Sequence, residues 1–282
     1  MYILAIETTG KAGSVALVKV DCETGLPGLS VRQAGGRQVA FKTIEGSMSH
    51  LRELVPTVSA VLADAGVSKN EISYVAASVG PGSFTGIRIG VSTARALSQA
   101  LGLSEAIAVP SLTAFMYKEK VRAACLTPAC RTDRAGRPAC IEHVSDGHDR
   151  QVICVIINAR RGQVYGRLDG YMEDGPYMLS DMLDVIRERV FADGHEVLFF
   201  GDGIDAYESQ INDALADVGK YAFADADIRY QDAESVAFCA AENLEKYKVP
   251  TAELLPDYMR KAEAEQKLEA GQLPICKGPK QE

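Results

Sequence analysis

The segment Tyr74–Gly90 limits the fold more than any other, because in it an apolar run ends in a glycine-rich turn and a helical pattern begins at once. The turn reads Gly80-Pro-Gly-Ser-Phe-Thr-Gly. Glycine adopts backbone angles that other residues avoid, and the start of a helix leaves N–H groups available to an anion. The segment therefore predicts a strand, a turn and a helix that together build one wall of a site.

Two common phosphate-binding motifs are excluded by the residues of this turn. A P-loop needs a lysine directly after its last glycine, whereas Ile87 and Arg88 follow Gly86. The dinucleotide motif has two residues between its last two glycines, whereas Gly82 and Gly86 have three between them. In addition, no acidic residue ends a second strand about 20 residues later to hold a ribose.

Length and charge restrict the class of protein. At 282 residues, the chain lies in the range of ~250–300 residues at which a single hydrophobic core stops growing, so two lobes are expected. No apolar run approaches the ~20 residues of a membrane span, and no basic leader precedes the first apolar run, which predicts a cytoplasmic protein. The net charge of −8, without a lysine or arginine cluster, argues against a dedicated nucleic-acid surface.

Two hairpins with the same plan are predicted. The apolar runs 2–6 and 14–20 enclose a polar turn, and the runs 152–157 and 163–168 enclose another. The strand and glycine turn at Val75–Ser83 are echoed in the same order by Val197–Ile204. These repeats predict an internal duplication.

Helical spacing of apolar residues predicts helices over Ser49–Ala65, Ser83–Leu101 and Ala233–Lys248. Pro56 lies inside the first of them and is expected to kink it or to mark its first turn. Because strands alternate with helices, we expect mixed sheets flanked by helices, arranged as two lobes that face a cleft.

The segment Val79-Gly-Pro-Gly-Ser-Phe-Thr-Gly-Ile-Arg-Ile-Gly-Val-Ser-Thr-Ala-Arg-Ala-Leu resembles the motif of the bacterial TsaB (YeaZ) family. Four further stretches occur in the order that this family shows. They are Tyr2–Thr9, Gly46–Leu51, Asn158–Tyr165 and Pro256–Glu265. The resemblance covers nearly the whole chain except residues 126–150.

This resemblance implies an α/β protein with the actin/Hsp70/sugar-kinase fold, which consists of two duplicated ribonuclease-H-like lobes. It implies an N-terminal lobe at 1–115 that carries dimerisation helices, and a C-terminal lobe at 116–270 that includes an insertion at 126–150. The residues 271–282 are expected to form a disordered tail.

The resemblance also implies a function. TsaB proteins are non-catalytic subunits of the complex that forms N6-threonylcarbamoyladenosine at position 37 of tRNAs that read codons beginning with A. The implied partners are a TsaD-like catalytic subunit, a TsaE-like ATPase, a second copy of the chain when it is alone, and tRNA only through the complex. No membrane, no metal and no required cofactor is expected.

The first hairpin loop is a candidate anion site. In nucleotide-binding members of this fold, that loop wraps a phosphate and an acidic residue at its start binds magnesium through water, and Glu7 occupies this position. The candidate residues are Glu7, Thr8, Thr9, Gly10, Gly80, Gly82 and Ser83. Two interpretations stay open: weak ATP or ADP binding, and a turn that keeps this geometry without a ligand. Asn158 favours the second, because it starts the second hairpin without a negative charge.

Metal ligands are sparse. TsaD relatives carry paired histidines on a helix, whereas the matching region here has only His50, with Glu53 three residues later. Cysteines and histidines also gather between Cys125 and His148, and the pair His143 and His148 has a spacing common in zinc sites, but the match to a zinc site is partial. An exposed insertion without a metal is the preferred interpretation of that region.

A stripe of small residues every four positions, Gly86, Gly90, Ala94 and Ser98, predicts close packing of the second helix. The neighbour is either the chain's own sheet or a partner's helix. The resemblance favours an association surface on the two helices near 47–65 and 84–101. Its candidate residues are His50, Leu51, Leu54, Arg88, Val91, Ser92 and Arg95.

Two enzymatic alternatives remain. A small-molecule kinase of the same fold needs a second carboxylate opposite Glu7, for which Asp202 is the best candidate. A metallopeptidase needs more ligands than His50 provides.

Overall fold

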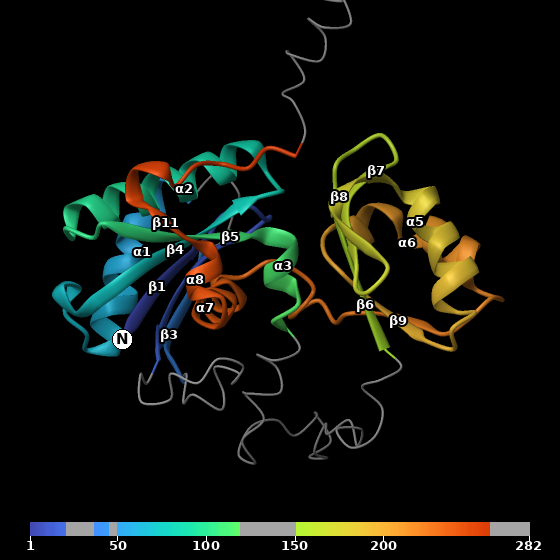
Figure 1. Cartoon of the computed structure of the whole chain (residues 1–282), viewed down its shortest axis with the longest axis horizontal. Coiled ribbons are helices and arrows are strands. Elements are labelled where there is room, and N and C mark those ends of the chain that lie inside the picture. The colour runs from blue at the N-terminus through green and yellow to red at the C-terminus, as the bar shows by residue number, and fades with distance from the viewer. Residues whose placement is uncertain (21–36, 45–49, 119–150, 260–282) are drawn as a thin grey trace, which may run out of the picture.

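The computed structural model describes residues 1–20, 37–44, 50–118 and 151–259, which form two lobes with one sheet each (Figure 1). The expected insertion at 126–150, the cysteines and histidines between Cys125 and His148, and the tail at 271–282 lie outside the described residues. The predicted α/β fold class, with two lobes of mixed sheets flanked by helices, is confirmed.

The first lobe contains a six-stranded sheet with the order β11-β5-β4-β1-β2-β3. Its strands are β1 (Tyr2–Glu7), β2 (Gly13–Lys19), β3 (Arg37–Ile44), β4 (Ile72–Gly80), β5 (Glu105–Pro110) and β11 (Lys248–Pro250). The predicted hairpin pairs β1 with β2 in antiparallel register, so that Leu4 lies opposite Leu17. On its other edge β1 pairs with β4 in parallel.

The second lobe contains a five-stranded sheet with the order β10-β9-β6-β7-β8. Its strands are β6 (Gln151–Asn158), β7 (Gln163–Leu168), β8 (Met172–Met178), β9 (Glu196–Phe200) and β10 (Tyr221–Phe223). In both lobes an antiparallel hairpin is followed by a third strand and then by a strand that pairs in parallel with the first. The strands follow one another as β1-β2-β3-β4-β5 in the first lobe and as β6-β7-β8-β9-β10 in the second. The internal duplication is therefore present in the strand order of both sheets.

Helices cover both faces of the first sheet. The helices are α1 (His50–Ala65), α2 (Phe84–Ala100), α3 (Ser111–Phe115), α5 (Leu179–Val185), α6 (Gly203–Leu215), α7 (Ala233–Glu242) and α8 (Leu244–Tyr247), with single-turn segments at Lys69–Glu71, Ile186–Val190 and Thr251–Glu253. Side chains of a strand alternate between its faces, so Leu4 packs with α1 and α2 while Ile3 packs with α7. Within the described ranges, no helix combines the length and apolarity that crossing a membrane requires.

The predicted helices match the structure except at one position. Helix α1 begins at His50 and continues through Pro56, which lies beyond its first turn. Helix α2 begins after Ser83, whose side chain caps it by accepting from the Gly86 N–H. The third predicted helix is interrupted at Asn243, where the backbone leaves the helical region and the side-chain amide donates to the carbonyl oxygen of Cys239.

The chain returns to the first lobe near its end, which corrects the expected boundary of the second lobe at 116–270. Strand β11 pairs with β5 at the edge of the first sheet. Helix α7 packs on the same sheet, where Val236 and Phe238 join its core. Because β11 and α7 both pack in the first lobe, this lobe is built from both ends of the chain.

Helix α3 lies between the two sheets (Figure 1). Its side chains Leu112 and Phe115 pack with Val155, Ile157 and Phe200 of the second sheet in one buried cluster. This apolar cluster holds the two lobes against each other.

Candidate functional site

Glu7 ends β1 at the centre of the first sheet and is completely buried. One of its carboxyl oxygens accepts the N–H of Thr9, and the other accepts the hydroxyl of Ser78 on β4. Burial raises the pKa of Glu7, and these hydrogen bonds offset only part of that effect. Each carboxyl oxygen thus accepts a hydrogen bond from the protein's own chain, at the position where the resemblance predicts a metal-binding acid.

The first hairpin loop lies directly on the start of α2. The Thr8 hydroxyl donates to the carbonyl oxygen of Gly86 at 2.7 Å, and the N–H of Ser83 donates to the carbonyl oxygen of Thr9 at 2.8 Å. A side chain on Gly82 or Gly86 would overlap the backbone of this loop. The glycines therefore allow the hairpin loop to lie directly against the start of α2, where loop and helix are joined by hydrogen bonds.

The structure brings most of the predicted anion-loop residues together. Glu7, Thr8, Thr9, Gly82 and Ser83 surround the junction of β1 with α2. Two others contact segments distant in sequence, and these contacts were not predicted. Gly10 faces the side chain of Gln231, and Gly80 lies against the backbone of Asp257.

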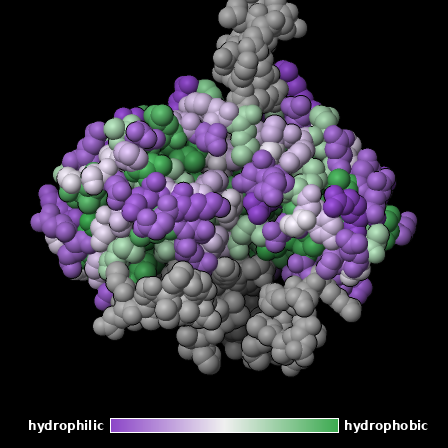
Figure 2. Space-filling model, viewed as in Figure 1, coloured by the Kyte–Doolittle hydropathy of each residue, from purple (hydrophilic) through white to green (hydrophobic). Residues whose placement is uncertain are grey.

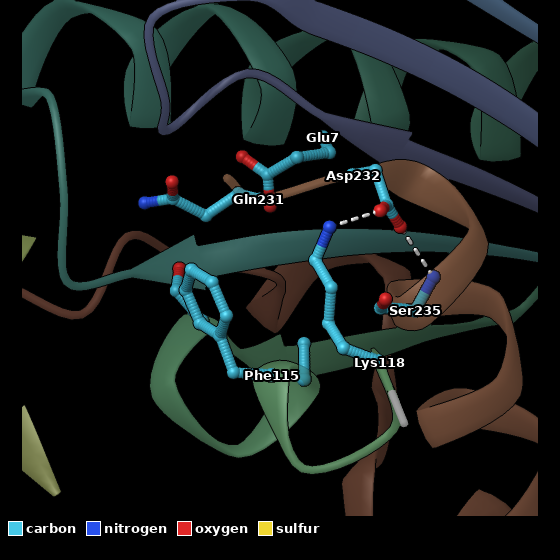
Figure 3. Close-up of a pocket in the computed structure, with 8 residues that line it drawn as sticks. Glu7, Phe115, Lys118, Gln231, Asp232 and Ser235 are labelled. Atoms are coloured by element: carbon cyan, nitrogen blue, oxygen red, sulfur yellow. Dashed lines mark hydrogen bonds and ion pairs between the residues drawn. The ribbon is translucent and has the colours of Figure 1, made fainter. Parts of the chain in front are cut away.

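A small polar pocket lies beside Glu7, between α3 and the start of α7 (Figure 3). Its lining residues are Glu7, Ser111, Ala114, Phe115, Lys118, Gln231, Asp232 and Ser235. Lys118 forms an ion pair with Asp232, whose carboxylate also caps α7 by accepting the N–H of Ser235 at 2.7 Å.

Some polar groups of this pocket have no partner in the described part of the chain. These are both amide atoms of Gln231 and the hydroxyl of Ser235, which are buried. Glu234 flanks the same helix start, and burial together with the charge of Asp232 raises its pKa to about 7. Sequence reasoning missed Lys118, Gln231 and Ser235. Gln231 and Ser235 reach the pocket only through the return of the chain to the first lobe, and Lys118 meets Asp232 for the same reason.

Polar contacts also join the two lobes near the first hairpin. Lys11 in the hairpin loop forms an ion pair with Asp205 of α6. Asp205 also accepts from Arg229 at 3.2 Å and from the hydroxyl of Tyr230 at 2.9 Å. Burial opposes ionisation of Asp205, but the hydrogen bonds from Lys11, Tyr230 and Arg229 outweigh it and lower its pKa.

The second hairpin has its own acidic residue. Asp202, at the start of α6, accepts the N–H of Asn158 at 2.9 Å. Burial raises the pKa of Asp202, and the hydrogen bond from Asn158 lowers it in part. Asp202 therefore stabilises the turn of the second hairpin, which is a structural use of the carboxylate that the kinase interpretation needs for chemistry.

His50 begins α1 and is buried against Gly13 of β2. Burial lowers the pKa of its imidazole, and its Nε2 atom has no hydrogen-bond partner among the described residues. Glu53, which the sequence offered as a second ligand, is half exposed and lies 3.6 Å from Arg52. No cluster of three or more candidate ligands occurs in the described ranges.

The predicted association face is only partly exposed, and three of its residues are corrected. Leu54 and Val91 belong to the core between α1, α2 and the first sheet, and His50 is buried too. The stripe Gly86, Gly90, Ala94 and Ser98 is also buried. These residues therefore pack on the chain's own sheet and not on a partner's helix. At Gly90, a side chain would overlap the Thr8 hydroxyl.

The remaining predicted residues do reach the surface. Leu51 is 76% exposed, Arg88 and Ser92 are exposed, and Arg95 is half-buried. The sequence reasoning missed Val55, which is 52% exposed, and Phe84, which is 38% exposed. Val55 lies four residues after Leu51 on α1, and this spacing is the signal that could have revealed it.

Hydrophobic surface elsewhere is limited. In the view of Figure 2, hydrophilic residues cover much of the molecule and hydrophobic residues form separate small groups. Large apolar side chains exposed outside the first lobe are Met178 and Val218.

The chain is similar to proteins of tRNA modification. Residues 45–268 match the model of the family described as TsaD, tRNA N6-adenosine threonylcarbamoyltransferase. A relative from Bacillus subtilis, the tRNA threonylcarbamoyladenosine biosynthesis protein TsaB, is 28% identical over 95% of this chain and 97% of its own. A tRNA N6-adenosine threonylcarbamoyltransferase from Streptococcus pneumoniae is 31% identical over 36% of this chain and 31% of its own.

Solved structures show the same fold. A Pseudomonas aeruginosa protein described as similar to the peptidase YEAZ superposes with a TM-score of 0.61 at 22% sequence identity, covering 92% of this chain and 99% of its own. The structure of YeaZ from the same organism gives a TM-score of 0.58 at 21% identity, covering 91% of this chain and 99% of its own.

Proposed function

The chain belongs to the TsaD-related family. A TsaB protein matches it over nearly its full length, and on this premise we propose that the chain takes part in forming threonylcarbamoyladenosine in tRNA. Its role is that of a non-catalytic scaffold which binds a TsaD-like catalytic subunit and a TsaE-like ATPase. It forms a homodimer when alone, acts in the cytoplasm, and meets tRNA only through the complex.

The observation that carries the non-catalytic role is the state of Glu7. Its two oxygens accept hydrogen bonds from Thr9 and Ser78, inside a completely buried environment. A carboxylate that binds magnesium or takes a proton from a substrate must present an oxygen to that group. Glu7 lines the small pocket, but each of its oxygens already accepts a hydrogen bond that ties β1 to β4 or to the hairpin loop.

The nucleotide interpretation is weakened by the start of α2. A helix start binds a phosphate through its free N–H groups. Here the N–H of Ser83 donates to Thr9, and the N–H of Gly86 donates to the side chain of Ser83. We propose that the subunit needs no cofactor and that ATP or ADP binds only weakly, with the protein's own loop in the position of a phosphate.

The association role is supported by the exposed surface of the first lobe. Leu51 and Val55 form an exposed apolar pair on α1, and Phe84 adds an aromatic ring at the start of α2. Aromatic residues and arginine are enriched at protein interfaces relative to the rest of the surface. Arg88 lies one turn after Phe84.

The first test is size-exclusion chromatography with light scattering on the protein alone and mixed with the TsaD-like subunit of the same genome. We expect a homodimer alone and a mixed complex with the partner. Leu51→Asp places a charge at the most exposed large apolar residue of the proposed face and should abolish both. Val218→Asp, an equally drastic change at an exposed apolar residue of the second lobe, should abolish neither.

The second test measures function. In a reaction reconstituted from purified subunits and tRNA, omission of this chain should abolish threonylcarbamoyladenosine formation, and Leu51→Asp should behave like omission. A monomer that ignores the TsaD-like subunit, together with full activity in its absence, would exclude the scaffold role. Substrate turnover by this chain alone would instead support an enzyme.

A further inference from the structure

The segment Leu254–Tyr258 comes after β11, runs along α2 and ends on the side of the first lobe that lies toward the second lobe (Figure 1). Leu254 is fully buried in the core that also contains Val91 of α2. The N–H of Asp257 donates to the carbonyl oxygen of Val79 at 2.8 Å. Gly80 allows this approach, because a side chain there would overlap the Asp257 carbonyl oxygen. The segment is therefore anchored at both its ends.

The anchored segment places Tyr258 against the first turns of α2. The ring of Tyr258 lies 4.6 Å from the ring of Phe84, centroid to centroid. Its hydroxyl accepts from Nε of Arg88 at 2.8 Å, and the Arg88 guanidinium lies 4.0 Å from the centre of the Phe84 ring. Two contacts thus fix the orientation of an arginine side chain at the surface.

This arrangement leaves part of the arginine available. Arg88 is exposed, and its two terminal nitrogens form no ion pair or hydrogen bond with another described residue. Phe84 and Tyr258 are 38% and 39% exposed, and Leu255 of the same segment is 57% exposed. An orientated guanidinium surrounded by apolar surface suits a carboxylate, which it binds with two parallel hydrogen bonds.

We propose that Leu254–Tyr258 is a third element of the association face and that Tyr258 is a positioning residue, which holds Arg88 for a carboxylate of the TsaD-like partner. This inference rests on the proposed scaffold function and adds to it the group that is recognised. A protein partner is favoured over RNA, because the chain carries a net charge of −8 and a nucleic-acid surface needs a basic face. Fixing the arginine before binding lowers the entropy lost on association.

The experiment is a double-mutant cycle on the dissociation constant for the TsaD-like subunit, measured by isothermal titration calorimetry. Arg88→Ala should weaken binding at least about 30-fold, as expected for a residue that dominates an interface. Tyr258→Phe keeps the ring but removes the hydroxyl, and should weaken binding about 2- to 10-fold, as expected for one hydrogen bond. In the Arg88→Ala background, Tyr258→Phe should have no further effect, because it acts through Arg88.

Tyr230→Phe is the matched control. It also removes a tyrosine hydroxyl that is hydrogen-bonded to a charged side chain, but near the hairpin loop and Asp205. It should leave the dissociation constant unchanged. Binding of wild type and Arg88→Ala at rising salt gives a further readout, since the wild type alone should lose affinity through screening of the ion pair.

The outcomes separate this inference from the scaffold function. If Leu51→Asp and Arg88→Ala weaken binding but Tyr258→Phe does not, or if its effect is the same in both backgrounds, the positioning role is overturned and the scaffold stands. If none of the three variants changes the affinity, both the face and the positioning role are wrong. If wild type does not bind the partner, both proposals fail together.

Discussion

The hydroxyl of Thr8 and the backbone of Gly90 are in contact, with no room for a side chain between them. Thr8 lies in the first hairpin loop and Gly90 in the second turn of α2, so this contact joins the loop to the helix. The same hydroxyl donates to the carbonyl oxygen of Gly86 at 2.7 Å. The helix glycines and the loop threonine therefore depend on each other.

Gly90→Ala should destabilise the protein by about 1–3 kcal/mol, because the added methyl group overpacks the contact with Thr8. Helix propensity alone predicts the opposite result, because alanine stabilises a helix by roughly 1 kcal/mol relative to glycine. Urea unfolding measures the difference. Ser92→Ala, on the exposed side of the same helix, should change the free energy of unfolding by no more than about 0.5 kcal/mol. A more stable Gly90→Ala variant would disprove the contact.

Glu234→Gln should change how stability depends on pH. The pKa of Glu234 is raised from 4.5 to about 7 by burial and by Asp232, so the folded state keeps its proton where the unfolded state has lost it. This carboxyl group therefore lowers stability as pH rises from 4.5 to about 7, and has no further effect above that range. The variant lacks this loss and should become more stable relative to wild type between pH 5 and pH 7, roughly the range spanned by the two pKa values.

Urea unfolding at several pH values within this range measures the effect. Glu208→Gln, which makes the same substitution at an exposed position of α6, is the comparison variant. Parallel curves for wild type and Glu234→Gln would mean that Glu234 ionises in the folded protein as readily as in the unfolded chain.

Asp202→Asn should leave ATP hydrolysis at the background rate that the wild type also shows. The Asp202 carboxylate accepts the N–H of Asn158, and Glu7 accepts hydrogen bonds from Thr9 and Ser78, so we expect neither acid to act in phosphoryl transfer. Phosphate release by the purified protein, with magnesium and ATP, provides the measurement. Hydrolysis that is above background in wild type and lost in Asp202→Asn would establish the kinase alternative.

Asp205→Asn should destabilise the protein by about 1 kcal/mol, since it weakens the hydrogen bonds from Lys11, Arg229 and Tyr230 that converge on this carboxylate. Lys11→Met combined with Asp205→Asn should show a coupling of about 0.2–1 kcal/mol that decreases with added salt. Unfolding curves at low and high salt give these values. Asp184→Asn, which removes an exposed pair with Arg187 inside one lobe, is the comparison. Coupling that does not change with salt would argue against an ion pair between the lobes.

Local patterns in the sequence predicted the elements well. The apolar runs around the two polar turns correspond to β1 with β2 and to β6 with β7. The helix after the glycine turn begins within one residue of its expected start, because Ser83 is a favourable cap. These features depend on neighbouring residues, so a single sequence contains the information.

The orientation of the helices was not predictable from the same patterns. Helix α1 is apolar on two sides, with Leu54 and Val58 in the core and Leu51 and Val55 at the surface. Spacing alone does not say which side meets the sheet. Val91 was assigned to a partner for this reason, although it is only 2% exposed, and a charge at this position would be buried without a partner charge.

Contacts between distant parts of the chain could not be predicted from the sequence either. Gln231 and Lys118 meet near Glu7 only because α7 packs on the first sheet. Asn243 could end a helix or continue it, and its side-chain bond to the hydroxyl of Tyr117 is made across more than 100 positions. Such contacts have no local pattern that a single sequence displays.

The return of α7 and β11 to the first sheet has a consequence during synthesis on the ribosome. The second sheet has all its strands once residue 223 has been made, whereas the first lobe still lacks Val236, Phe238 and Leu254 from its core. Domains that form from a continuous segment fold as they emerge, N-terminal ones first. Here the order is reversed, and the lobe that is begun first is completed last, so a nascent chain stopped before residue 233 carries a finished second sheet beside an open first core.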